Sequence, residues 1–310
     1  MLPRANLMMA LVLSLAAARL AAALRLRLSA GLSTLISAPK GQVLIKGSSK
    51  SATLSMSATR ATMDKTMSLV KTRVNALAPR LVQGLRDDGF FVSDGFLGHS
   101  LIKTLRAEAS KLYKTGRMDK SQSARWCPVE KRPILYDKHN VFATQLMGGE
   151  MYDEAPRLHE YTVALVRSLV PHINQAFPEA LLSEKLASNK LAVCVGDGSA
   201  YDKHYDNEGL SDTRKVTFLL YMNQNWRPEN GGVFRIYNSA DSAAGPTTDI
   251  SPIADRILCF WSDRLVHSVE PSFAQRGESD HRYALTVWLT STSVSAIARD
   301  DDMVKLHFGS

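Results

Sequence analysis

Two histidines and one aspartate stand at positions from which they could share a metal ion. His204 and Asp206 are two residues apart in a stretch with strand character, so their side chains can point to the same face. His267 follows an apolar run much later in the chain. A His-x-Asp pair alone is a weak signal. With His267 it predicts a site of two histidines and one carboxylate, whose three open coordination positions suit an iron(II) oxygenase.

An arginine in an unusual place strengthens this interpretation. Arg282 begins the otherwise apolar stretch 283–289. If that strand is buried, the guanidinium needs a partner. A dicarboxylate co-substrate would supply one through two parallel charge-assisted hydrogen bonds, and Asp263 is the alternative partner. A zinc hydrolase would leave Arg282 unexplained, so the order His-x-Asp, His, Arg favours an oxygenase that uses a keto acid.

These groups lie in the β-rich part of the chain. After residue 190, short runs rich in β-branched and aromatic residues alternate with turn residues. Such spacing predicts a jelly roll or barrel. The candidate strands are 191–195, 201–206, 216–223, 233–237, 249–253, 256–261, 265–269 and 283–291.

The part before residue 190 is predicted to be mainly helical. Helical periodicity favours helices at 71–86, 100–115 and 156–176, with a short buried strand within 89–97. The segment 116–149 shows no clean apolar period and is expected to be irregular. Helices followed by strands indicate one α+β domain, with helices packed on a β-sandwich.

The excess of positive charge belongs to the N-terminal segment. The formal net charge is +8, and residues 1–63 contain eight basic residues and no acidic one. The rest of the chain is formally neutral, which argues against nucleic acid as a partner. Three cysteines are too few for a disulfide framework, and they do not stand at zinc spacing with histidines.

We interpret residues 1–63 as a leader. Arg4 precedes an apolar run at 7–18, as in a secretory signal, whereas the Ser-, Ala- and Thr-rich stretch 29–63 is typical of a transit peptide. An anchor or a disordered tail is the third interpretation. A signal or transit leader indicates the secretory pathway or an organelle, the alternative being the cytoplasm, and no stable membrane span is expected after its removal. The expected divisions are a leader at 1–63, a helical N-terminal part of the catalytic domain at 65–189, a dioxygenase core at 190–292 and a tail at 293–310.

Residues 190–290 resemble the 2-oxoglutarate- and iron(II)-dependent prolyl 4-hydroxylases, and most of all the hypoxia-inducible-factor prolyl hydroxylases and their bacterial and protist relatives. A weaker likeness extends upstream to about residue 80. The resemblance implies a double-stranded β-helix, or jelly roll, with flanking N-terminal helices. The matching stretches are 195–201, 204–207, 216–223 with Trp226, 231–236, 250–252 with Asp255 and Arg256, 260–264 with His267, and 282–288.

The resemblance also implies roles for individual residues. Iron(II) would be held by His204, Asp206 and His267, and Arg282 would pair with the distal carboxylate of 2-oxoglutarate. The remaining implied positions are Tyr221, Thr286 and Cys194 near the keto acid, and Tyr201, Arg214 and Trp288 near the substrate prolyl group. From their residue types alone, Arg214 could equally be a solvated turn residue, and Trp261 and Trp288 could be ordinary core packing.

Two departures from the family concern the substrate and the keto acid. Cys194 lies where the animal oxygen sensors carry a tyrosine, and 117–149 does not match their substrate-covering loop. The collagen-type branch has lysine where Arg282 stands, which favours the sensor-like branch. We therefore expect a dioxygenase that uses iron(II), 2-oxoglutarate, dioxygen and ascorbate to hydroxylate proline in a polypeptide. The alternatives are the same enzyme acting on proline-rich secreted or cell-wall proteins, and a non-catalytic binding module.

Overall fold

The computed structural model of the protein describes residues 49–127, 129–130, 132–147, 149–207, 209, 211–241 and 245–298. The chain divides into two compact units between Ala52 and Thr53, and the fold described below is that of the second unit. Most of the predicted leader and of the tail lie outside the described residues. Among the helices that are described, none has the length and apolar character needed to cross a membrane.

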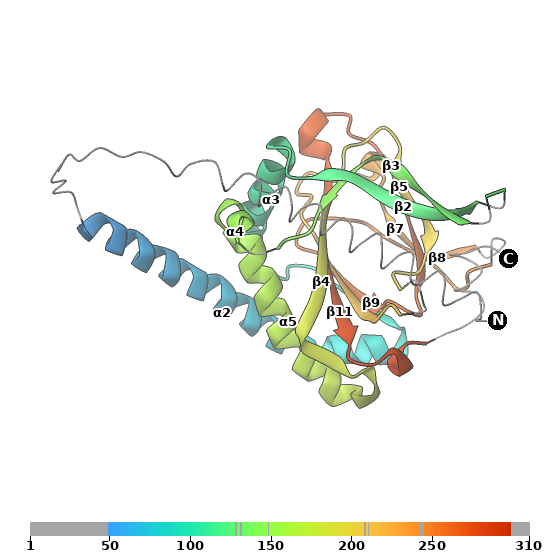
Figure 1. The fold of residues 1–310 in the computed structure, drawn as a ribbon, viewed down its shortest axis with the longest axis horizontal. Coiled ribbons are helices and arrows are strands. Elements are labelled where there is room, and N and C mark those ends of the chain that lie inside the picture. Colours follow the sequence, from blue (N-terminus) through green and yellow to red (C-terminus); the bar gives the residue numbers. More distant parts are fainter. Residues whose placement is uncertain are drawn as a thin grey trace, which may run out of the picture. The chain divides into compact units, whose positions relative to one another are not determined.

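The described strands form two antiparallel sheets that enclose a common core (Figure 1). The sequence-based expectation of an α+β fold with a jelly-roll core is confirmed. The larger sheet has the order β1 (Phe90–Ser93), β9 (Ile257–Trp261), β6 (Arg214–Tyr221), β11 (Arg282–Ser291), β4 (Leu182–Cys194), β3 (Arg132–Thr144), β2 (Asp119–Cys127), and the smaller one β5 (Ser199–His204), β10 (Val266–Ser272), β7 (Phe234–Tyr237), β8 (Pro246–Ile250).

Strand β11 shows how the larger sheet separates two environments. Successive side chains of a strand point to opposite faces. The odd-numbered residues, from Tyr283 to Leu289, pack into the core beneath the helices. The even-numbered ones, including Arg282 and Thr286, therefore face the smaller sheet, where Ala284 belongs to the core between the sheets. The predicted chemistry of Arg282 thus lies inside the jelly roll.

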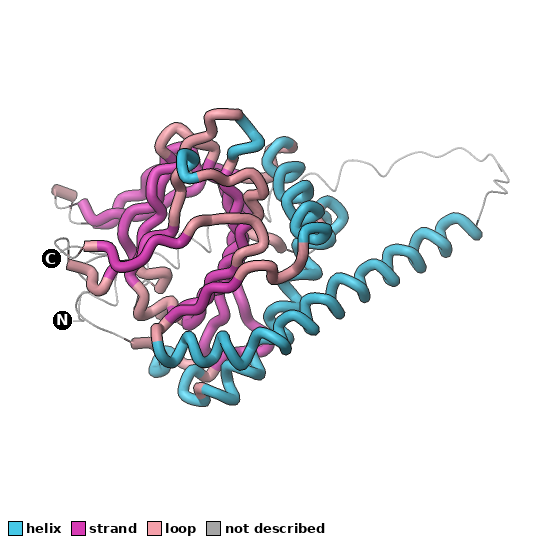
Figure 2. Tube along the Cα trace, turned by 180° about the vertical axis from the view of Figure 1, so that it is seen from behind, coloured by secondary structure: helices cyan, strands magenta, loops and turns pink. Residues whose placement is uncertain are grey.

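Helices cover the outer face of the larger sheet. Helix α5 (Pro156–Ala176) contacts β4 and β11, and α3 (His99–Lys114) contacts α5 in turn. Figure 2 shows the helices on one side of the strands. Helix α2 spans Ser49–Asp87, far longer than the predicted 71–86, so the expected end of the leader at residue 63 falls inside a helix.

The prediction of an irregular segment at 116–149 is wrong. Strands β2 and β3 pair as a long antiparallel hairpin at the edge of the larger sheet, followed by helix α4 (Glu150–Glu154). Exposed apolar residues such as Leu135 and Val129 explain why its apolar residues show no period. In β3 the half-buried face carries the polar Lys138 as well as the apolar Ile134, while Leu135 lies on the exposed face, so residue type does not follow the alternation of burial.

Several strand boundaries also differ from the expected ones. Strand β4 begins at Leu182 rather than 191, and β5 ends at His204 rather than 206. Asp206 therefore stands in the turn that follows β5. Four short 3-10 helices complete the described part, at Pro178–Ala180, Pro228–Asn230, Gly277–Asp280 and Val294–Ala296.

Candidate active site

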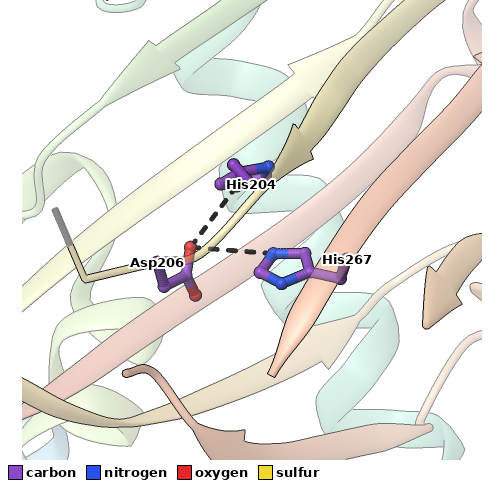
Figure 3. A group of neighbouring side chains, drawn as sticks. All are labelled: His204, Asp206 and His267. Atoms are coloured by element: carbon purple, nitrogen blue, oxygen red, sulfur yellow. Dashed lines mark ion pairs between the residues drawn. The ribbon is translucent and has the colours of Figure 1, made fainter. Parts of the chain in front are cut away.

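Pairing of β5 with β10 places the two predicted histidines side by side. His204 is the register partner of His267, and their ring centroids are 4.3 Å apart. Asp206 reaches the same point from the turn after β5: its Oδ1 lies 3.7 Å from His204 Nε2 and 3.8 Å from His267 Nε2 (Figure 3). Ligand atoms of all three residues lie within 4.8 Å of one another, close enough to hold one metal ion.

Backbone contacts orient the two imidazoles. His204 Nδ1 lies 2.7 Å from the carbonyl oxygen of Asp202, and His267 Nδ1 lies 3.1 Å from that of Leu265. A proton on each Nδ1, donated to a carbonyl, leaves each Nε2 with a free lone pair toward Asp206. Phe234 stacks on His267 at 4.5 Å and fixes the plane of its ring.

A buried hydroxyl pair anchors the carboxylate. Thr217 donates a 2.7 Å hydrogen bond to Asp206 Oδ2, and its hydroxyl lies 2.8 Å from that of Ser262. Asp206 Oδ1 is thereby left for a metal. Sequence reasoning gave neither Thr217 nor Ser262 a role. The available signal was a threonine within the otherwise apolar run 216–221 of strand β6, because a buried hydroxyl needs a partner.

The electrostatics of the cluster suit a cation. Burial opposes the charge of Asp206, but the imidazoles of His204 and His267 and the Thr217 hydroxyl outweigh it, so the pKa of this carboxyl lies well below its usual range. Burial, with the neighbouring His204, lowers the pKa of His267 from 6.5 to about 3. The carboxylate is thus ionised and this imidazole neutral, the forms that bind metals.

Arg282 and Tyr221 form an unsatisfied polar pair within the same interior. Arg282 is 5% exposed, donates from Nε to the carbonyl of Gly232 at 2.8 Å, and lies over the Tyr221 ring at 5.3 Å. Within the described residues, no carboxylate forms an ion pair with Arg282, and the buried Tyr221 hydroxyl has no hydrogen-bond partner. The alternative that Asp263 pairs with Arg282 is wrong, because Asp263 binds Lys215 at 2.7 Å.

This pair fits the distal carboxylate of a dicarboxylic acid. The guanidinium keeps its terminal N–H groups for an anion. Burial raises the pKa of Tyr221 to about 12, so its hydroxyl remains a donor. The keto end of an acid held here would point toward His204, Asp206 and His267. These three side chains are the donor set of an iron(II) site.

Comparison with known proteins identifies the family. Residues 190–290 match the model of the 2OG-Fe(II) oxygenase superfamily. Human prolyl hydroxylase EGLN3 is 31% identical over 223 residues, which cover 71% of this chain and 85% of that protein. The chain belongs to the prolyl hydroxylase family of these oxygenases. The hypoxia-inducible factor prolyl hydroxylase of Caenorhabditis elegans is 29% identical over 71% of this chain, although the match spans only 29% of that longer protein.

Solved structures share this fold. A prolyl 4-hydroxylase from Phytophthora capsici is 26% identical with a TM-score of 0.56, over 72% of this chain and 65% of that one. A Trichoplax adhaerens prolyl hydroxylase, solved with a hypoxia inducible factor peptide fragment, has a TM-score of 0.57 at 24% identity and covers 74% of this chain and 96% of that one. The prediction of a 2-oxoglutarate-dependent dioxygenase is confirmed, and its cofactors are iron(II), 2-oxoglutarate and dioxygen.

The residues expected near the keto acid share the inward-facing side of the larger sheet with Arg282 in this prolyl hydroxylase. Cys194 is its register partner across β4 and is buried. Thr286 lies four residues farther along β11, on the same face, and is half-buried. Both positions are therefore compatible with the expected pocket.

The residues expected near the substrate are half-buried and lie on β5, β6 and β11. Tyr201 stacks beside His204 at 6.5 Å between centroids. Arg214 is not a solvated turn residue: it opens β6, is bound by Asp212 through two nitrogens, and lies over the Trp288 ring at 5.1 Å. Trp261 is core packing, with its indole N–H bonded to Leu85, whereas Trp288 faces the interior and its buried N–H has no partner among the described residues.

Proposed function

We propose that this protein hydroxylates prolyl residues of a polypeptide, with His204, Asp206 and His267 as iron ligands. The observation that carries the proposal is the cluster itself. Two oriented imidazoles and an anchored carboxylate converge from β5 and β10. The same interior contains Arg282 without a carboxylate partner in the described part of the chain.

The residues of the chain act by binding and orientation. Arg282 and Tyr221 would hold the distal carboxylate of 2-oxoglutarate, and Thr286 would line that pocket. When bound, iron(II) supplies the oxidation in which one atom of dioxygen goes to succinate, formed with carbon dioxide from the keto acid, and the other to a prolyl C–H bond. The two sheets shield this chemistry from water, since the site lies between them.

The binding of the polypeptide is assigned to half-buried residues beside the metal site. We propose that Tyr201 and Trp288 contact the prolyl ring and that Arg214, fixed by Asp212, holds the indole in place. Residues 190–292 would form the dioxygenase core and 65–189 its covering part. Ascorbate would serve as the reductant that keeps the iron in the iron(II) state.

The test uses the full chain with iron(II), ascorbate and 2-oxoglutarate. Two peptide pools are offered, one proline-rich and one with a single proline among leucine and alanine. Peptide mass and succinate are measured together, with His267→Ala as control. A gain of one oxygen with matching succinate, absent in the control, is expected from one pool. Succinate without peptide oxidation would reject both substrate classes, and neither product from folded, iron-loaded protein would reject the enzyme.

A further inference from the structure

Two lysines lie beside the candidate iron site without a role in the chemistry proposed above. The ammonium of Lys138 is 4.1 Å from the centroid of the Tyr201 ring, and that of Lys190 is 5.5 Å from it. The Tyr201 ring itself stacks beside His204. Both cations are therefore separated from an expected metal ligand by a single side chain.

The backbone directs both lysines toward this place. Lys190 on β4 is the register partner of Thr286 on β11, so it shares the inward-facing row of Cys194. Lys138 comes from β3, two residues before Asn140, whose φ of 51° accompanies a shift of register against β2. Strand β3 pairs with β4 only from Val141 onward, so the part that carries Lys138 is free to turn over Tyr201.

Neither lysine forms an ion pair in the described part of the protein, although Asp206 is near enough to favour the charged form of both, and Asp202 that of Lys138. Lys190 donates one hydrogen bond to the Ser121 hydroxyl at 2.9 Å, and Lys138 lies against the Tyr201 ring. Other cations nearby are matched: Arg214 binds Asp212. Burial, and secondly the charge of Lys190, lower the pKa of Lys138 to about 8. A half-buried charge without a counter-charge is costly, so an anion from outside is expected here.

The cofactors do not supply that anion. In the proposed site the metal and Arg282 carry three positive charges, and Asp206 with the dicarboxylate carries three negative ones. The complex is then neutral without the lysines. Dioxygen is uncharged, so the charges of the two lysines remain for the substrate.

We propose that Lys138 and Lys190 form a carboxylate-binding subsite that selects polypeptides with an aspartate or glutamate near the target proline. This rests on the proposed function. In an extended peptide, side chains two residues apart lie on the same side at about 7 Å. With the prolyl ring at Tyr201, an acidic side chain within one to three residues reaches the two ammonium groups.

Binding and turnover are tested with alanine-based peptides that contain one proline. One set carries Asp or Glu within three residues of the proline, and the matched set carries Asn or Gln there. Binding is measured by fluorescence anisotropy on the full chain loaded with iron(II) and 2-oxoglutarate without oxygen, and kcat/KM is measured in air. Acidic peptides should bind about tenfold tighter, the difference expected for one charge-assisted contact.

Variants locate the preference. Lys138→Met and Lys190→Met should each reduce it, and the double variant should abolish it. Lys190→Glu should abolish it as well, because the new carboxylate would pair with Lys138 over the Tyr201 ring. Lys185→Met removes the same charge from an exposed position of β4 and should change nothing. The KM for 2-oxoglutarate should stay unchanged in all of them.

The outcomes separate the two proposals. Equal binding of acidic and amide peptides, with hydroxylation of both, would overturn the subsite and leave the proposed function standing. An intact acid preference in the double variant, with a raised KM for 2-oxoglutarate, would assign the lysines to the keto acid instead. An acid preference in binding without any hydroxylation would support the subsite and reject prolyl hydroxylation.

Discussion

Replacing Thr217 by valine should weaken metal binding while keeping the shape of the core. The threonine is fully buried, and valine matches its volume but cannot donate the 2.7 Å hydrogen bond to Asp206. A hydrogen bond to a charged group contributes about 1.5–3 kcal/mol, so metal affinity should fall roughly 10- to 100-fold. The Ser262 hydroxyl also loses a partner, which should cost the metal-free protein about 1–3 kcal/mol.

The two effects are separated by measuring unfolding with and without metal. A tenfold loss of affinity lowers the stabilisation by a saturating metal by about 1.4 kcal/mol, beyond the loss already present in the metal-free variant. Thr290→Val is the matched control, because it removes a hydroxyl that bonds the Leu186 carbonyl elsewhere on the sheet. Equal metal stabilisation in wild type and Thr217→Val would refute the claim that this hydroxyl positions the ligand.

Three further predictions follow from the same region. In Gly232→Ala the new Cβ would stand 2.7 Å from Arg282 Cδ, so the guanidinium must move. The KM for 2-oxoglutarate should therefore rise about tenfold. An unchanged KM would contradict the assigned role of Arg282. Lys215→Met leaves Asp263 buried without its ion-pair partner, which should lower the free energy of unfolding in urea by about 3–5 kcal/mol. Adding Asp263→Leu should restore most of that free energy. A loss under about 1 kcal/mol in the single variant would show that the ion pair does not matter for stability. His267 has a pKa of about 3 in the fold and 6.5 as a free side chain, so only the unfolded state gains a proton between these values. Stability of the metal-free protein should therefore fall by about 2 kcal/mol from pH 8 to pH 5, and a His267→Gln variant that keeps the same slope would assign it to other groups.

The sequence predicted those parts of the fold and site that depend on periodicity and residue type. Helix α5 was predicted at its observed bounds, because its apolar face is continuous and buried. His204 and Asp206 could be proposed as ligands because their spacing lets both side chains point to one face of a strand, and His267 because it follows an apolar run later in the chain. Arg282 could be singled out because a cation in a buried strand demands a partner.

What could not be predicted depends on contacts between distant segments. The hairpin of β2 and β3 has a covered face, but polar residues such as Ser121 and Lys138 lie on it and the apolar Leu135 lies on the exposed face, so residue type shows no period. The hydrogen bond from Thr217 to Asp206 joins a strand to a turn, and no spacing rule reports it. The meeting of Lys138 and Lys190 over Tyr201 depends on where β3 bends, which only the folded chain shows.

The positive φ of Asn140 separates two parts of strand β3 that have different strand partners. Residues from Val141 to Thr144 are bound to β4 and belong to the scaffold, while those before Asn140 are paired only with β2. Mutations in the part of β3 before Asn140 can therefore alter the surroundings of Tyr201 without disturbing the sheet that holds Arg282. Relatives could acquire new substrates by changing this part alone, so substrate range should diverge along β3 faster than the chemistry does.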